Sequence, residues 1–289
     1  MHVENFYDTR TSTFTHVVVD EETKKCATID SVLDYDQDAG RFYTESADKV
    51  VQYIQDNGLE NEWILETHIH ADHITGAFYL KEKIGGKTAI GTRIKEVLEL
   101  WVPIFELVDE VPLSGEQFDK LFEDGEQFKI GTLNAEVFQT PGHTPACSTY
   151  HIEDAVFVGD TVFNPNLGTA RCDFPGGSAE DLYNSIQRIY TLPDDTVMYL
   201  CHDYPKGDDK PLVKTTVGEQ KKKNIMLNEN TSPEEYIEKR TVRDNTLAVP
   251  KLLFPSIQTN IRLGDFGEKS EVTGFRYIKI PVGMFDHAD

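Results

Sequence analysis

The chain has 289 residues, of which 39% are hydrophobic and 27% charged, a composition typical of a globular protein with a large core. Its 50 acidic and 28 basic side chains give a formal net charge of −22, which would repel a nucleic-acid backbone. No apolar run approaches the ~20 residues of a membrane span, and the N-terminus MHVENFYDTR lacks the pattern of a secretory signal. The four cysteines form no C-x-x-C pair, so we expect reduced thiols in a cytoplasmic protein that binds neither nucleic acid nor a membrane.

The first quarter of the chain predicts a hairpin, a loop, a helix and a buried strand, in that order. Residues 14–30 hold two β-rich runs joined by a polar turn, which is typical of a hairpin. Residues 31–44 are polar and aperiodic, which predicts a long loop. A helix is expected over 46–57, with Ser46 as its N-cap and a stripe of apolar residues along one face. The apolar residues 63–65 then predict a short strand.

Helical and strand-like segments continue to alternate through the rest of the chain. A cap-like Ser178 precedes one helix, and Ser232 followed by Pro233 starts another. Composition does not shift enough to mark a linker, so we expect one catalytic domain over 1–204, with residues 205–289 forming an extension packed on it. The expected helices are 74–84, 93–107 and 179–190, and the expected strands are 88–91, 133–139, 147–152, 155–158 and 197–200.

The strongest chemical signal is the segment H-x-H-x-D-H, which follows the strand at 63–65 and contains His68, His70, Asp72 and His73. Three imidazoles and a carboxylate within six residues would crowd together on one loop. A divalent cation resolves this crowding, because neutral imidazole and carboxylate are good metal ligands. The segment therefore predicts a metal site.

Three further candidate ligands, His143, Asp160 and His202, each follow an apolar run that reads as a strand. Each would be a weak signal alone. The ends of neighbouring strands deliver loops to one edge of a sheet, where a rigid scaffold holds catalytic groups. The ordered set therefore predicts one site built from four loops.

This ordered set resembles the metallo-β-lactamase superfamily over roughly residues 14–204. The resemblance implies an α/β (α+β) fold, the αββα sandwich of two mixed β-sheets flanked by helices. In two-metal members of the family, the first metal would be held by His68, His70 and His143 and the second by Asp72, His73 and His202, with Asp160 bridging them.

Two branches of the superfamily look nearest. The strings E-T-H-x-H-A-D-H-I-T-G, P-G-H-T-P, R-C-D-F and C-H-D-Y are similar to persulfide dioxygenases, which oxidise glutathione persulfide with O₂ to sulfite and glutathione. That resemblance implies one Fe(II) per chain, with His68, His143 and Asp160 as iron ligands and catalytic residues. His70, Asp72, His73 and His202 would then surround the iron or form a vacant or weak second site.

Glyoxalase II, a hydrolase of glutathione thioesters with one or two zinc ions, is the main alternative. It predicts a dinuclear centre and product formation without oxygen consumption. A protein that kept the fold without catalysis is a further alternative, but a degenerate member would be expected to have lost a ligand, and none is missing.

Substrate recognition requires local cations, because glutathione is anionic and so is the chain. Arg171 is the first candidate, since it follows a ligand in a glycine-containing loop, and Tyr204 is the second. Lys251 is weaker, and Asn260 and Arg262 are weaker still. Cys172 and Cys201 lie near the motifs, but we expect them to be buried fillers and not nucleophiles. The resemblance also suggests a homodimer.

Overall fold

Two mixed β-sheets of six strands each form the centre of the computed structural model, which describes residues 1–285. In the first sheet, with the order β1-β2-β3-β6-β8-β9, the strands from β3 onward are parallel. In the second sheet, β10 to β15 follow in chain order, and only β13 and β14 are parallel. The first sheet consists of β1 (His2–Asp8), β2 (Thr13–Asp20), β3 (Lys25–Ile29), β6 (Glu60–Leu65), β8 (Lys87–Gly91) and β9 (Lys120–Phe122). The second consists of β10 (Gln127–Ile130), β11 (Leu133–Gln139), β12 (Ser148–Ile152), β13 (Ala155–Phe157), β14 (Val197–Tyr199) and β15 (Lys214–Thr216).

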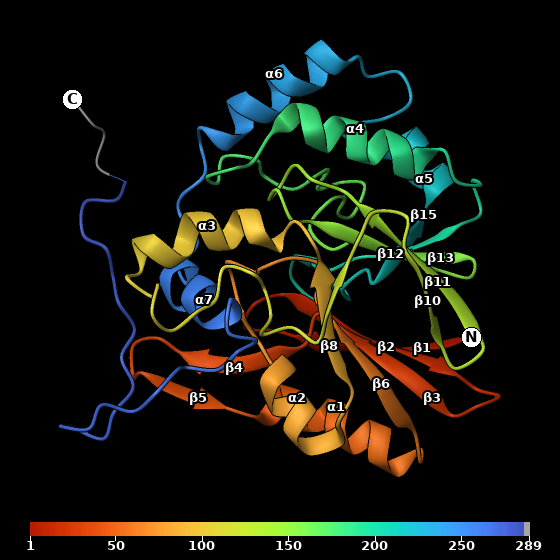
Figure 1. Ribbon diagram of the computed structural model, residues 1–289. Coiled ribbons are helices and arrows are strands. Elements are labelled where there is room, and N and C mark those ends of the chain that lie inside the picture. The colour runs from red at the N-terminus through yellow and green to blue at the C-terminus, as the bar shows by residue number, and fades with distance from the viewer. Residues whose placement is uncertain (286–289) are drawn as a thin grey trace.

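Helices cover the outer faces of both sheets. In Figure 1, α4 and α6 lie above the sheets and α1 and α2 below them, with α3 and α7 at the left. Ser178 and Ser232 cap α4 and α6 as predicted, because their side chains accept hydrogen bonds from the main-chain N–H groups of Asp181 and Glu235. The helices are α1 (Glu45–Asp56), α2 (Ala77–Ile84), α3 (Ile94–Ile104), α4 (Ala179–Tyr190), α5 (Val217–Lys223), α6 (Pro233–Asp244) and α7 (Leu253–Asn260).

Three buried apolar clusters hold these layers together. The central cluster lies between the sheets, where Val18 and Leu65 of the first sheet pack with Val137 and Tyr150 of the second. A second cluster joins the first sheet to α1, α2, α3 and α7, and a third joins the second sheet to α4, α5 and α6. This helix–sheet–sheet–helix packing confirms the predicted αββα sandwich.

The loop predicted over 31–44 is wrong, because this segment forms the antiparallel strands β4 (Val32–Asp36) and β5 (Arg41–Tyr43). With β7 (Ile74–Thr75) they make a small third sheet. Asp34 on β4 is buried and accepts hydrogen bonds from the main-chain N–H and the hydroxyl of Ser46. The predicted cap at Ser46 is therefore also wrong, because α1 begins one residue earlier and Asp34 binds its first turn.

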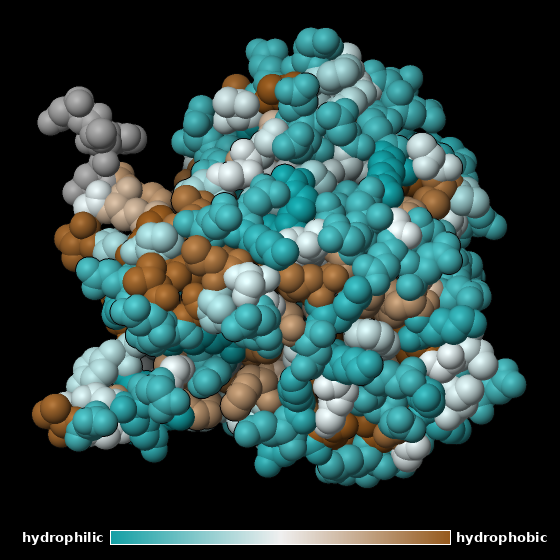
Figure 2. Space-filling view, in the orientation of Figure 1, coloured by the Kyte–Doolittle hydropathy of each residue, from teal (hydrophilic) through white to brown (hydrophobic). Residues whose placement is uncertain are grey.

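The chain after residue 204 also contacts the body of the protein. α7 packs against α3 and β7, and α6 packs against α4. Hydrophilic residues cover most of the face shown in Figure 2, and hydrophobic residues gather at the left over α3 and α7. None of the helices in the described part of the chain is long and apolar enough to cross a membrane.

Candidate metal centre

Four loops bring seven potential metal ligands to one edge of the sandwich, as the sequence predicts. The first loop, between β6 and β7, carries four of them, and single ligands follow β11, β13 and β14. Six of the seven side chains are buried, whereas Asp72 keeps 31% of its side chain exposed. The ligands are His68, His70, Asp72 and His73 on the first loop, then His143, Asp160 and His202.

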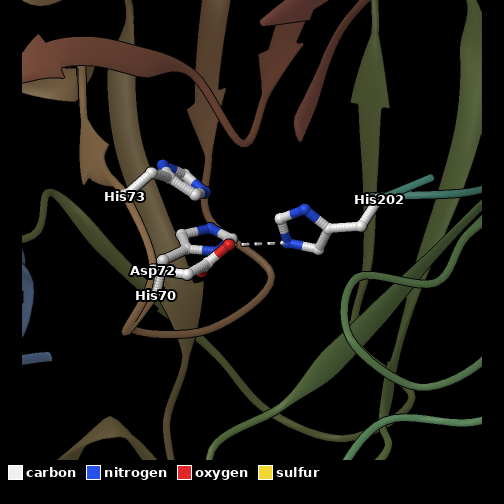
Figure 3. A group of neighbouring side chains, drawn as sticks. All are labelled: His70, Asp72, His73 and His202. Carbon is white, nitrogen blue, oxygen red and sulfur yellow. Dashed lines mark ion pairs between the residues drawn. The ribbon is translucent and has the colours of Figure 1, made fainter. Parts of the chain in front are cut away.

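The seven side chains form two groups, and within each group all the ligand atoms lie within 4.8 Å of one another. His68, His143 and Asp160 make one group, and His70, Asp72, His73 and His202 make the other. Figure 3 shows the second group, with the first-loop residues facing His202 and an ion pair from Asp72 to its ring.

Asp160 lies between the two groups. Its Oδ1 is 3.3 Å from His202 Nε2, and its Oδ2 is 3.7 Å from His143 Nε2. The carboxylate therefore has one oxygen toward each group. This is the position that the sequence comparison with two-metal proteins implies for a bridging ligand.

Every histidine of the site has its outer ring nitrogen against an oxygen atom. In a neutral ring this contact fixes the tautomer, so that the inner nitrogen keeps its lone pair. The pKa of His70 is raised well above its ordinary value by Asp30 and Glu66, so this ring must lose a proton before its inner nitrogen can bind a metal. The contacts are His68 Nδ1 with Thr67 Oγ1 (3.0 Å), His70 Nε2 with Asp30 Oδ1 (3.1 Å), His73 Nδ1 with Ile74 O (3.4 Å), His143 Nδ1 with Arg171 O (2.8 Å) and His202 Nδ1 with Ser12 O (3.2 Å).

The inner ligand atoms, in contrast, have no hydrogen-bond partner. They are His68 Nε2, His70 Nδ1, His73 Nε2, His202 Nε2 and Asp160 Oδ1, all buried. His202 Nε2 and Asp160 Oδ1 lie 3.3 Å apart as an ion pair without hydrogen-bond geometry. A buried polar atom without a hydrogen-bond partner costs about 1–3 kcal/mol, so these atoms of the two ligand groups need an explanation. Divalent metal binding supplies it, because it satisfies these lone pairs together. The residues present therefore fit a metal cofactor.

The electrostatics of the site follow from its burial. Burial lowers the pKa of His68 well below its ordinary value, and the neighbouring imidazoles lower it further. Burial and His70 likewise lower the pKa of His73 to about 3. Both rings are therefore neutral at pH 7, which is the form that binds a metal. Burial also opposes a charge on His202, but Asp160 and Asp72 outweigh it and raise its pKa.

Asp30, which the sequence analysis missed, supports the first loop from behind. Its Oδ1 accepts hydrogen bonds from the Thr67 N–H and His70 Nε2, and its Oδ2 accepts one from the Thr67 hydroxyl. Its backbone φ of +51° places it in the left-handed region, directly after β3. The only sequence signal is a charged residue at the end of an apolar strand.

A cavity of about 660 Å³ opens beside the first ligand group. His143, Asp160 and Asp72 line one part of it. Its wall also includes Arg171, Arg240 and Arg243, which are three of the nine arginines in the chain. Apolar side chains complete the lining, among them Phe163, Leu167, Phe174, Met226 and Leu247. The cavity thus combines metal ligands, an apolar wall and cations.

Arg171 lines this cavity, but its guanidinium already has partners. Its Nε and Nη2 each donate to a carboxylate oxygen of Asp173 at 2.6 Å, and its Nη1 donates to Ala248 O at 2.8 Å. The main-chain oxygen of Arg171 accepts the hydrogen bond from His143. The residue therefore orients a ligand through its backbone and joins two loops through its side chain.

Tyr204 and Lys251 lie where a second cavity, of about 1010 Å³, reaches Asp72. Tyr204 lines both cavities, is 49% exposed and stacks on His202, with ring centroids 6.2 Å apart. Lys251 lines only the second cavity.

The weaker substrate-binding candidates and the cysteines lie elsewhere. Asn260 is buried behind the first loop, and Arg262 pairs with Glu110 on the surface, so neither faces the first cavity. Cys172 and Cys201 are buried, and burial raises the pKa of both thiols, which leaves them protonated at pH 7.

Known proteins similar to this chain carry several different names. A protein named Glyoxylase B2 from Dictyostelium discoideum is 50% identical over 97% of this chain and 96% of its own length. The mitochondrial persulfide dioxygenase ETHE1 of Homo sapiens is 31% identical over 87% of this chain and 84% of its own length. The crystal structure of ETHE1 from Myxococcus xanthus superposes with a TM-score of 0.73 at 29% identity, covering 92% of this chain and all of that one.

The family match includes every candidate ligand. The profile of the metallo-beta-lactamase superfamily matches residues 8–202, from the end of β1 to the last histidine of the site. The superfamily consists of metallo-hydrolases and oxidoreductases, and the two ligand groups indicate a metal cofactor. With its fold, its ligand order and its relatives in agreement, the chain belongs to the metallo-beta-lactamase superfamily.

Proposed function

We propose that this protein is a persulfide dioxygenase with one Fe(II) ion per chain, held by His68, His143 and Asp160. The observation that carries the proposal is the separate group of two histidines and one carboxylate, which borders the cavity whose wall contains Arg171, Arg240 and Arg243. Such a triad leaves coordination positions open, so that a bound iron can activate O₂ next to a sulfur ligand. The 31% identity with a named persulfide dioxygenase supports the same reaction.

The proposed substrate is glutathione persulfide or a similar low-molecular-weight persulfide. Glutathione persulfide, O₂ and water would give glutathione, sulfite and two protons. The terminal sulfur gains two oxygen atoms from O₂, which is reduced, and water then cleaves the sulfur–sulfur bond. This reaction requires no Ser or Cys nucleophile, and Cys172 and Cys201 near the motifs are buried thiols.

The cavity residues would bind and orient the thiol carrier. Arg171 pairs with Asp173, and Arg240 pairs with Asp244. In the described structure the side chain of Arg243 makes one hydrogen bond, to the Thr246 hydroxyl, and no ion pair. Arg243 is therefore the cavity cation most available to a substrate carboxylate.

The apolar wall and Tyr204 would complete recognition. Phe163 and Phe174 lie in the cavity lining with the ligands His143 and Asp160, where their rings would pack against the thiol carrier. Tyr204 lies between the two cavities, where its phenol can contact the carrier, and Lys251 can act only on a ligand that extends into the second cavity.

A second candidate function is thioester hydrolysis of the glyoxalase II type, with a dinuclear centre of zinc or another metal. The specific observation that favours it is the complete second group, His70, Asp72, His73 and His202, with Asp160 facing both groups. The 50% identity with Glyoxylase B2 favours it as well. Under this alternative the same cavity would hold a glutathione thioester.

Two assays on one iron-loaded preparation separate these functions. We expect rapid oxygen uptake with glutathione persulfide, with equimolar sulfite, and negligible anaerobic hydrolysis of a lactoylglutathione thioester. Thioester hydrolysis without oxygen, together with no oxygen uptake on the persulfide, would replace the proposed function by the second one. A zinc-loaded sample serves as the matched control, because zinc has no redox chemistry.

A further inference from the structure

A buried asparagine from the C-terminal segment contacts the main chain of the first metal-binding loop. Asn260, the last residue of α7, is 1% exposed. Its Nδ2 donates to the carbonyl oxygens of His70 at 2.9 Å and His73 at 2.8 Å. Its Oδ1 accepts a hydrogen bond from the N–H of Thr75 at 2.9 Å. One side-chain amide thus binds two main-chain groups of the loop and one of β7, which directly follows it.

These three contacts enclose the part of the loop that carries most of the second ligand group. His70, Asp72 and His73 lie within the clamped residues 70–75. Carbonyl groups buried in a loop need partners that a helix or sheet would otherwise supply, and here Asn260 is that partner. Its amide uses both of its donors and one acceptor position, a pattern that no hydroxyl or carboxylate side chain can reproduce.

The chain that follows Asn260 fixes the position of the clamp. Gly264 has a φ of +90°, and a Cβ at this position would lie 2.1 Å from Thr75 O, so the two backbones are in close contact. The carbonyl of Leu263 accepts a hydrogen bond from Phe78 N–H at the start of α2. Residues 260–264 therefore contact the end of the loop and the helix that follows it.

We propose that Asn260 is a positioning residue of the metal centre, which holds the loop from 68 to 75 in the shape that presents its ligands to the metal. The residue lies outside the segment 8–202 that matches the superfamily, so part of the metal-site geometry depends on the C-terminal segment. The inference requires only that the site binds a metal. If the chain binds two metals, the clamp holds His70, Asp72 and His73 directly. If it binds one iron through His68, His143 and Asp160, the clamp acts on the metal site through the main chain that joins His70 to His68.

The test compares Asn260→Ala with Gln258→Ala. Gln258 is a matched control because it lies on the same helix, is 4% exposed and also makes three side-chain hydrogen bonds. Its partners are Phe254 and Lys279, not the metal-binding loop. Metal-free samples of both variants and of the wild-type 289-residue chain are titrated with Co²⁺ alone. The readouts are the dissociation constant against a competing chelator, the visible absorption spectrum of bound Co²⁺, and the melting temperature of each metal-free chain.

We expect Asn260→Ala to bind Co²⁺ about 10–100-fold more weakly than wild type, the loss typical of removing a group that orients ligands. Its cobalt spectrum should also change, whereas Gln258→Ala should keep the wild-type affinity and spectrum despite a lower melting temperature. Equal cobalt binding by the two variants would overturn the proposal. If Asn260→Ala fails to fold, Asn260→Ser replaces it, and wild-type binding by a folded Asn260→Ser chain would overturn it equally. Failure of both Asn260 variants beside a folded Gln258→Ala chain would assign Asn260 to folding and reject the proposal.

Discussion

Replacing Arg243 by alanine tests how the cavity recognises its substrate. The side chain makes one hydrogen bond, to the Thr246 hydroxyl at 3.3 Å, so its removal should cost the fold little. A charge-assisted contact with a substrate carboxylate is worth about 1.5–3 kcal/mol, and the exposure of Arg243 favours the lower end. About 1.5 kcal/mol corresponds to roughly a tenfold rise in the KM for glutathione persulfide, with kcat nearly unchanged.

The assay measures oxygen uptake with glutathione persulfide and with the persulfide of glutathione diethyl ester. Lys239→Ala is the matched control, because it removes a cation from the same helix but from a position outside both cavities. We expect the rise in KM only for Arg243→Ala and only with the acidic substrate. An unchanged KM, or the same rise with the ester, would refute the assignment of Arg243 to a substrate carboxylate.

Three further predictions follow from individual contacts. Asp160→Asn should lower the iron content and abolish oxygen uptake, because one charged ligand of the group is lost; a fully active variant would reject the ligand set. Arg171→Ala should lower the free energy of unfolding by about 1–2 kcal/mol in urea titrations, because its guanidinium joins Asp173 to Ala248. It should raise KM less than Arg243→Ala does. A larger rise in KM for Arg171→Ala than for Arg243→Ala would assign substrate binding to Arg171. Burial lowers the pKa of His16 from 6.5 to about 4, although Asp30 and the Leu200 carbonyl act to raise it. Between pH 6.5 and 4 the unfolded chain therefore binds more protons than the folded chain. As the pH falls through this range, the free energy of unfolding of the metal-free wild type should decrease by up to about 3 kcal/mol more than that of His16→Gln. Parallel plots of unfolding free energy against pH for the two proteins would contradict this.

The ligands were predictable because their signal is local. H-x-H-x-D-H occupies one short segment, and the other three ligands each follow an apolar strand, so periodicity alone places them near one sheet edge. The sandwich itself rested on the resemblance, and the three apolar clusters confirm it. What sequence reasoning predicted well therefore depends on short segments and on a known order of motifs.

The groups that support the ligands were not predictable, because their partners are distant in the chain. Asp34 looked like a loop residue, but it is buried because Ser46 and Arg10 satisfy its carboxylate. Asp30 and Asn260 contact the metal-binding loop across 37 or more residues. Arg171 looked free for substrate until the fold placed Ala248 beside its guanidinium. No periodicity in the sequence reports such contacts.

The complete second ligand group leaves the number of metals as the central question. All of its ligand atoms lie within 4.8 Å of one another, so distance alone does not prevent a second ion. His70 differs from His68 and His73, because Asp30 and Glu66 outweigh the effect of burial and raise its pKa well above the ordinary value. A second metal would have to displace that proton, which disfavours it relative to the neutral His68 site.

Titration of the metal-free enzyme with Fe(II) tests the central claim most directly. Oxygen uptake with glutathione persulfide is measured after each anaerobic addition, and bound iron is counted in the same samples. A mononuclear dioxygenase predicts uptake that rises linearly and reaches its plateau at one iron per chain. A plateau at two metals per chain, or full metal loading with thioester hydrolysis and no oxygen uptake, would contradict it.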